Sequence, residues 1–233
     1  MNKILLVLLS ATLIFSSCSK DGDTTQPEEI VTNQTVAING TTYPAVKIGT
    51  QTWTAVNYNG SGGQNYNSTT NDPAYGKLYT VAESKAITLP AGWRLPTKAD
   101  FEKLISNYPH TVTADGYNIL PDGCKKLKST TGWTVTTGDN TSGFNALSAG
   151  IGVIPTTTLG QYQDKGSDAW FISSTNGSSR VISGVTYTDT YAMNIASETY
   201  QSGNQNLIDD NGSVHALYQS ADYRYSIRFV KDN

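Results

Sequence analysis

The residues that could carry out chemistry are few and far apart in this chain. The only two histidines, His110 and His215, have no second histidine or cysteine at metal-ligand spacing. Cys124 is the only cysteine outside the N-terminal segment, and we expect a buried apolar thiol there. Neither a G-x-S-x-G motif nor a phosphate-binding G-x-x-x-x-G-K-[ST] loop occurs. We therefore expect no enzyme activity, no catalytic residue, no bound metal and no cofactor.

Aromatic residues in loops are the stronger candidates for a binding role. Five tyrosines lie in loops rich in glycine and serine: Tyr58, Tyr66, Tyr75, Tyr162 and Tyr187. This composition is typical of adaptable binding surfaces, but it is also common in extracellular β-rich proteins that bind nothing. We place the candidate ligand-binding loop at Tyr162, Asp164, Asp168 and Trp170.

Oxygen-rich turns are the only places where calcium could bind. Calcium accepts carboxylate, amide and carbonyl oxygens, and the best local matches are Asp139–Asn140 and the segment 164–168. Solvated turn residues explain both better, and the same holds for Asp209–Asp210 before Asn211-Gly212. Calcium is an alternative that no motif indicates.

Arg94 lies in the stretch AGWRLPTKADFEKL, just before an expected helix. Thr97 can cap that helix by accepting from the amide of Asp100, which places a negative charge in the first turn. Apolar residues then recur at helical spacing from Phe101 to Tyr108, and Pro109 ends the run. Arg94 is either a structural donor to loop carbonyls or a catalytic or anion-binding arginine. We favour the structural role, and we expect the flanking Trp93 and Leu95 to enter the core.

Short elements on both sides of this helix indicate an α+β domain with two short helices, small antiparallel sheets and long loops. Asn39-Gly40 predicts a two-residue hairpin turn, and Gly49-Thr50 predicts a second turn. Pro44 suits an edge strand or a bulge. Short helices are also indicated near 81–85 and 122–127, and strands are indicated at 168–175, 191–197 and 223–230.

The N-terminal segment resembles a bacterial lipoprotein signal. A lysine precedes the apolar run 4–15, which is too short to span a bilayer, and small residues lead to Cys18. The resemblance implies cleavage before Cys18, acylation of that cysteine and a lipid anchor in the membrane. We divide the chain into a signal peptide (1–17), a flexible tether (18–34) and one domain (35–233). The acidic residues after Cys18 resemble the signal that directs lipoproteins of Bacteroides-type bacteria to the outside of the outer membrane.

The charge of the chain argues against one class of partner. The formal net charge is −3 and no basic block occurs, so we expect no nucleic-acid partner. If Cys18 carries lipid, Cys124 has no partner for a disulfide within the chain.

Seven stretches occur in the order and spacing of one family: VKIGTQTWTAVNYNG, YGKLYTVAE, AGWRLPTKADFEKL, LKSTTGW, SGFNALSAG, WFISST and YSIRFV. Together, over about residues 36 to 231, they resemble the Fibrobacter succinogenes major paralogous domain. The resemblance implies a fold like that of C-type lectins and of the formylglycine-generating enzymes. It places all four tryptophans within family motifs, where we expect core packing, with Trp170 the least settled. Neither the calcium-dependent sugar motifs of lectins nor an active cysteine pair is present.

The family resemblance also implies that this chain lacks a disulfide found in many members. Many members have a cysteine before the G-W of the third stretch and another near the end, a pair that implies a disulfide. Leu89 and Phe229 occupy these positions here. We expect an apolar Leu89–Phe229 contact in place of that bond.

These observations favour a surface-exposed outer-membrane lipoprotein whose domain binds a ligand or mediates adhesion without catalysis. The ligand would be a glycan or a surface protein, contacted by loops of the second half. Two alternatives are a glycan-binding accessory protein of a polysaccharide-degrading system and a structural envelope or fimbria-associated subunit, which needs an apolar patch or an open strand edge. A third is an unfamiliar enzyme, which needs Glu83, Glu102 or Asp168 to converge in a pocket.

Overall fold

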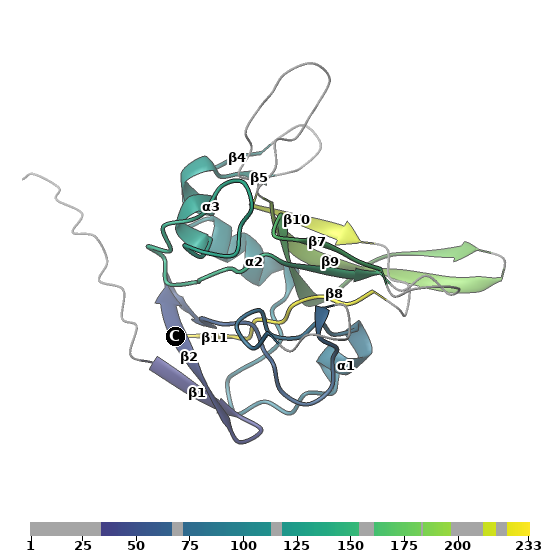
Figure 1. Cartoon of the computed structure of the whole chain (residues 1–233). Coiled ribbons are helices and arrows are strands. Elements are labelled where there is room, and N and C mark those ends of the chain that lie inside the picture. Colours follow the sequence, from purple (N-terminus) through teal and green to yellow (C-terminus); the bar gives the residue numbers. More distant parts are fainter. Residues whose placement is uncertain are drawn as a thin grey trace, which may run out of the picture.

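A computed structural model describes residues 34–66, 72–112, 118–153, 161–182, 184–196, 212–217 and 223–233 (Figure 1). Residues 1–33 lie outside this part of the chain, and with them Cys18, the expected signal and nearly all of the tether. Within the part described, no helix combines the length and apolarity needed to cross a membrane.

Three sheets and three short helices make up the described chain. The helices are α1 (Val81–Lys85), α2 (Lys98–Ile105) and α3 (Pro121–Leu127). The strands are β1 (Gln34–Ile38), β2 (Thr41–Ile48), β3 (Gln51–Thr54), β4 (Thr111–Val112), β5 (Asn118–Ile119), β6 (Ala149–Val153), β7 (Gln161–Lys165), β8 (Asp168–Ile182), β9 (Val185–Ala196), β10 (Gly212–Leu217) and β11 (Val230–Asp232). The mixed α+β class is confirmed. The described residues contain three helices, one more than the two expected for the domain as a whole, and each lies where a helix was indicated from the sequence.

The first sheet joins both ends of the domain, in the order β1-β2-β3-β11. The predicted hairpin turn is confirmed, because Asn39 and Gly40 both have positive φ and Ile38 pairs directly with Thr41. The expectation of an edge strand at Pro44 was wrong, since β2 lies between β1 and β3. Pairing with β3 begins only at Ala45, so the missing amide hydrogen of Pro44 interrupts no ladder on that side.

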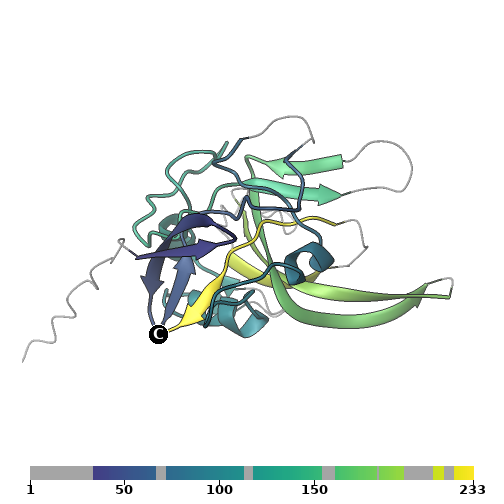
Figure 2. The same cartoon turned by 90° about the horizontal axis from the view of Figure 1, so that it is seen from below.

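The second sheet has the order β10-β9-β8-β6-β7. Its two longest strands, β8 and β9, form an antiparallel ribbon that extends beyond the rest of the fold (Figures 1 and 2). Both strands were indicated from the sequence, but each is longer toward the ribbon tip than expected. The short pair β4–β5 forms the third sheet.

The start of α2 follows the predicted capping arrangement. The Thr97 side chain accepts from the Asp100 amide, and the Asp100 carboxylate accepts from the Thr97 amide at 2.7 Å. The buried face of the helix is Phe101, Leu104 and Ile105, as the spacing indicates. The cap therefore sets where the helix begins, and its apolar stripe sets its orientation against the core.

Two apolar clusters form the core, and β8 lies between them. Ala169 and Phe171 belong to the first cluster, with Trp53, Phe101 and Trp133, whereas Ile172 belongs to the second. Because successive side chains of a strand point to opposite faces, both faces of β8 are covered here. This double burial explains why residues 169–172 of β8 are all apolar and are followed by the small Ser173.

The core roles expected for the tryptophans hold for two of the four. Trp53 and Trp133 are buried, whereas Trp93 and Trp170 are partly buried and pack against the edge of the second cluster. Phe229 is fully buried in that cluster and Leu89 packs against it. The direct Leu89–Phe229 contact stays a prediction.

The segment 223–230 differs from the continuous strand that its alternation indicated. Its residues pair singly with three different segments: Arg224 with Gly152, Tyr225 with Tyr79, and Ser226 with Phe171. Only 230–232 forms a strand. Residues 224–230 are buried on both sides of the chain, so the segment is a buried junction that passes between the two clusters.

Arg228 lies at the centre of this junction. Its guanidinium is fully buried and donates to the Asn57 side chain and to the carbonyls of Thr54, Phe144 and Asn145, at 2.6–2.9 Å. It also lies 4.7 Å from the Phe144 ring centroid. Burial holds the pKa of Arg228 well below its usual range, because no carboxylate among these partners offsets the desolvated charge. Backbone oxygens and a ring face therefore solvate this cation.

Removing this cation should destabilise the fold strongly. Arg228→Met leaves three buried carbonyls and the Asn57 amide without their donor, so we expect a loss of about 3–5 kcal/mol in the free energy of unfolding. Urea denaturation measures the change. Lys47→Met, which removes an exposed cation from β2, is the control and should change stability by less than about 0.5 kcal/mol. An equal effect of both substitutions would contradict the role of Arg228.

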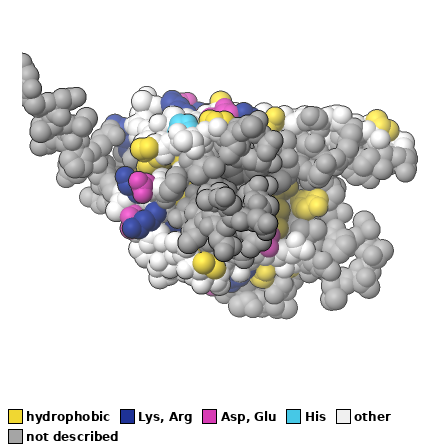
Figure 3. All heavy atoms as spheres, turned by 90° about the horizontal axis from the view of Figure 1, so that it is seen from above, with side chains coloured by type: hydrophobic (Ala, Val, Ile, Leu, Met, Phe, Trp, Pro, Cys, Tyr) yellow, Lys and Arg dark blue, Asp and Glu magenta, His cyan; other side chains and the backbone are white. Residues whose placement is uncertain are grey.

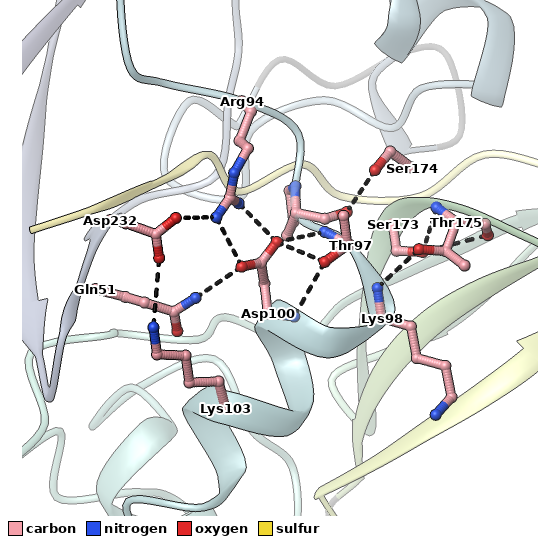
Figure 4. A network of polar contacts seen from close by, with 11 residues as sticks. Gln51, Arg94, Thr97, Lys98, Asp100, Lys103, Ser173, Ser174, Thr175 and Asp232 are labelled. Carbon is pink, nitrogen blue, oxygen red and sulfur yellow. Dashed lines mark hydrogen bonds and ion pairs between the residues drawn. The ribbon is translucent and has the colours of Figure 1, made fainter.

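Arg94 joins the helix cap to the C-terminal strand (Figure 4). Its Nη1 and Nη2 donate to the two oxygens of Asp100, at 2.6 and 2.9 Å, and Nη2 also donates to Asp232 at 2.6 Å. The Gln51 amide donates to Asp100, and Lys103 lies 3.4 Å from Asp232. The structural role favoured for Arg94 fits these contacts, but its side chain binds two carboxylates where loop carbonyls were expected.

The link to Asp232 should give the fold a defined pH dependence. The hydrogen bond from Arg94 holds the pKa of Asp232 below its ordinary value. A lowered pKa stabilises the fold above the unfolded-state pKa of about 3.9, and this contribution disappears as pH falls through the folded-state pKa. Because Asp232 is largely exposed, we expect Asp232→Asn to cost only about 0.5–1 kcal/mol at pH 7.

Urea denaturation of the wild type and of Asp232→Asn at pH 7, 4 and 2.5 tests this dependence. The difference in unfolding free energy should shrink steadily as pH falls and vanish at the lowest value. A difference that stays constant across this range would show that the carboxylate charge is not what matters at this position.

Candidate functional site

Two tyrosines lie against one lysine, and a third tyrosine packs against one of these two rings. Lys165 Nζ lies 4.0 Å from the Tyr75 ring centroid and 5.5 Å from that of Tyr66. The Tyr66 and Tyr162 rings are 5.2 Å apart and inclined by 50°. We call this group, with the adjoining Gln64 and Asp72, the tyrosine–lysine surface.

Polar contacts fix the positions of these rings. The Tyr162 hydroxyl donates to Gln64 Oε1 at 2.8 Å, and the backbone of Gln64 pairs with Leu78. Lys165 Nζ also lies 3.8 Å from Asp72 Oδ2. Contacts between the 64–79 loop and β7 thus hold side chains that are about a hundred residues apart in sequence.

Two elements bring the surface together. β7 carries Tyr162 and Lys165 and is held against β6, where Tyr162 pairs with Gly152 and Lys165 with Ala149. The described residues 64–66 and 72–79 carry the other members, with Gln64 bridged to Leu78 and α1 beginning at Val81. The tyrosines are therefore displayed by a sheet and by segments next to the 64–78 bridge.

The tyrosine–lysine surface is polar and partly exposed. Burial raises the pKa of Tyr66, and burial together with the nearby Asp72 carboxylate raises that of Tyr75. Both phenols therefore stay protonated at neutral pH and can donate hydrogen bonds. Ring faces, hydroxyl donors, an amide and an ammonium group together suit a ligand with both apolar faces and hydroxyl groups.

The predicted ligand-binding loop falls into two parts. Tyr162 and Asp164 are on β7, whereas Asp168 and Trp170 are on β8, with β6 between these strands in the sheet. Asp168 Oδ1 accepts from Asn194 at 2.9 Å, and Trp170 packs against the second cluster. Only Tyr162 of the four belongs to the tyrosine–lysine surface.

The other loop tyrosines separate as well. Tyr66 and Tyr75 join Tyr162, but Tyr58 is buried in the second cluster, where it contacts Tyr43 and Tyr79. Tyr187 lies on β9 opposite Arg180, and its side chain is outside the described part. Of the four whose side chains are described, a binding role is therefore available to three.

The candidate calcium turns have local partners. The Asp139 carboxylate accepts from the amide and hydroxyl of Thr141, and these bonds hold its pKa low although its slight burial acts to raise it. Asn140 accepts from the Asn145 amide. Over the described residues, no three metal-ligating side chains of His, Cys, Asp or Glu converge. Asp209–Asp210 lies outside the described residues.

The carboxylates of the enzyme alternative have different partners. Glu83 binds Arg224 and caps α1, Glu102 pairs with Lys98, and Asp168 accepts from Asn194. Cys124 is fully buried in α3, in agreement with the sequence, and His110 is exposed after α2. On the face shown in Figure 3, the described acidic and basic side chains are interspersed.

Sequence reasoning named the three tyrosines but missed what joins them. Gln64, Asp72 and Lys165 carry no motif, and their only signal was a position in polar loops beside aromatic residues. Local pattern cannot pair residue 66 with residue 162. That pairing follows from how β7 meets the loop.

Comparison with known proteins identifies the family. A model of the Fibrobacter succinogenes major domain matches residues 46–231, which is most of the chain. No curated protein and no solved structure matches the chain. The match covers the first core cluster, most of the second, Arg228 and the tyrosine–lysine surface. The chain therefore belongs to the Fibrobacter succinogenes major domain family.

Proposed function

We propose that this protein is a non-catalytic, glycan-binding lipoprotein displayed on the outer membrane. The lipid on Cys18 would hold it there, and the tyrosine–lysine surface would contact the ligand. The observation that carries the proposal is that Tyr66 and Tyr75 lie against Lys165 while Tyr162 packs against Tyr66. Aromatic rings bind the apolar faces of sugars, and fixed hydroxyl and amide groups select among their hydroxyls.

A lectin-like domain architecture is part of this proposal. Its support is that β1–β3 and β11, from the two ends of the domain, share one sheet while the second half is rich in loops. Glu83, Glu102 and Asp168 also have separate partners, which favours binding over catalysis. Calcium is not needed by this proposal.

Binding of the chain from residue 19 onward to a broad glycan array tests the proposal. This form keeps every described element, and the array is run once with calcium and once with a chelator. We expect saturable binding that the chelator does not abolish. Tyr162→Ala should weaken it about tenfold, as expected for an aromatic contact of about 1–1.5 kcal/mol.

Tyr191→Ala is the matched control. Tyr191 lies beneath a lysine, as Tyr66 and Tyr75 do, with Lys98 Nζ 5.4 Å from its ring centroid, but it is on β9. This variant should bind like the wild type. Equal losses in the two variants, or no glycan bound in either condition, would contradict the proposal.

A structural envelope subunit is the second candidate, and the β8–β9 ribbon favours it. Pairing of β9 with β10 ends at Thr190, and Val181 near the ribbon tip is 68 % exposed. Within the described residues, the outer ribbon therefore presents strand edges that a second copy of the chain could extend.

Light scattering with size-exclusion chromatography tests this candidate. A structural subunit should form assemblies at micromolar concentration. Thr186→Pro should reduce them, because proline removes a strand donor and blocks further pairing. A monomer at all concentrations, or assemblies unchanged in this variant, would rule out pairing through the ribbon.

A further inference from the structure

Arg224 is a buried cation beside the tyrosine–lysine surface. Its backbone pairs with Gly152 of β6 through two hydrogen bonds of 2.9 Å, and the next residue, Tyr225, pairs with Tyr79. The residue is 8 % exposed. Arg224 is therefore held rigidly in the junction, with its side chain directed by the sheet.

Only part of the Arg224 guanidinium is used by the protein. Nη1 donates to Glu83 Oε2 at 2.6 Å, while the buried Nε has no hydrogen-bond acceptor among the described residues. A guanidinium is a planar fork, and its Nε and Nη2 together form an edge that matches the two oxygens of a carboxylate. A buried donor without an acceptor costs free energy, and a ligand oxygen at this edge would remove that cost.

Gly152 lets the stem of Arg224 lie next to the Tyr162 ring. A Cβ on Gly152 would lie 2.9 Å from Arg224 Cβ and 3.4 Å from Tyr162 Cε1. The missing side chain thus lets the arginine stem and the tyrosine ring share the space over β6. Tyr162 in turn contacts Gln64 and Tyr66, so Arg224 adjoins the tyrosine–lysine surface at Tyr162.

We propose that the Nε–Nη2 edge of Arg224 binds the carboxylate of a uronic acid, in a glycan whose ring lies on Tyr162. This inference rests on the proposed glycan-binding function and specifies its ligand class. An aromatic face next to a bidentate cation matches a sugar that carries a carboxylate, whereas a neutral sugar leaves Nε without an acceptor. An acidic peptide would supply the carboxylate but no ring to lie on the tyrosine.

Glu83 competes with such a ligand for the arginine. Its carboxylate also accepts from the Thr80 amide at 2.8 Å as the cap of α1. Although desolvation acts to raise it, these hydrogen bonds hold the pKa of Glu83 below its ordinary value. Glu83 is therefore negative at neutral pH and offsets part of the charge that the ligand would meet.

The test uses the chain from residue 19 and oligogalacturonate, with the methyl-esterified oligosaccharide as the matched neutral ligand. Calorimetry should show the free acid bound at least about tenfold more tightly than the ester. A sulfated oligosaccharide of equal length and a poly-glutamate peptide complete the set, and both should bind more weakly than the free acid.

Two substitutions should change affinity in opposite directions. Arg224→Lys keeps the charge but loses the planar edge, so it should bind the acid more weakly than the wild type does and should prefer it less over the ester. Glu83→Gln keeps an acceptor for the helix cap and removes the competing charge, so it should bind the free acid several-fold more tightly. Lys103→Gln removes a cation on α2 and should change nothing. Circular dichroism establishes that each variant is folded.

The outcomes separate this inference from the proposed function. If acid and ester bind equally to the wild type and Tyr162→Ala weakens both, the carboxylate inference is wrong and glycan binding stands. Tighter binding of the peptide or of the sulfated sugar overturns it as well. Unchanged affinity of Glu83→Gln for the free acid also contradicts it. If the array detects glycans but neither galacturonate form binds, only this inference fails.

Discussion

Arg228, a buried cation with no carboxylate among the partners described above, holds the halves of this domain together. Arg228 reaches from the late junction to the end of β3, to Asn57 and to the carbonyls of residues 144 and 145. Lone charges are expensive to bury, so the surrounding backbone has to keep its oxygens directed at the guanidinium. The path of the chain through 54–57 and 144–145 is constrained by this requirement, and both core clusters are built around it.

The arrangement explains how one protein can have a rigid centre and a varied surface. The junction 223–230 pairs in turn with β6, with the loop before α1 and with β8, and each pairing fixes a segment that leads outward. The tyrosine–lysine surface is built from two such segments, β7 beside β6 and the loop that ends at α1. Loops carried on a fixed scaffold can differ in composition without disturbing the core.

Local features could be predicted from the sequence because their causes lie within a few residues. Asn39-Gly40 needs two positive φ values, and the cap of α2 needs Thr97 and Asp100 three residues apart; both were found where expected. The segment 223–230 was predicted to be a continuous strand, but only 230–232 is one. The alternating sequence of this segment does not distinguish a strand from a chain segment that is buried on both sides. Of the two partners of Arg94, only Asp100 is near it in sequence. Local pattern therefore could not indicate the contact with Asp232. The same limit applies to Tyr66 and Tyr162, which meet only through the fold.

The sheet that unites both ends of the domain has a consequence for the order in which the molecule is made. Within the domain, β1, β2 and β3 are made before the other elements, yet the sheet is complete only when Val230 to Asp232 pair with β3. Arg228, which the core requires, also follows every element of the domain except β11. A nascent chain that has not reached residue 228 therefore lacks both the central cation and the closing strand. Contacts this distant in sequence also make folding slow, so the domain can complete its fold only after residues 228–232 have been made.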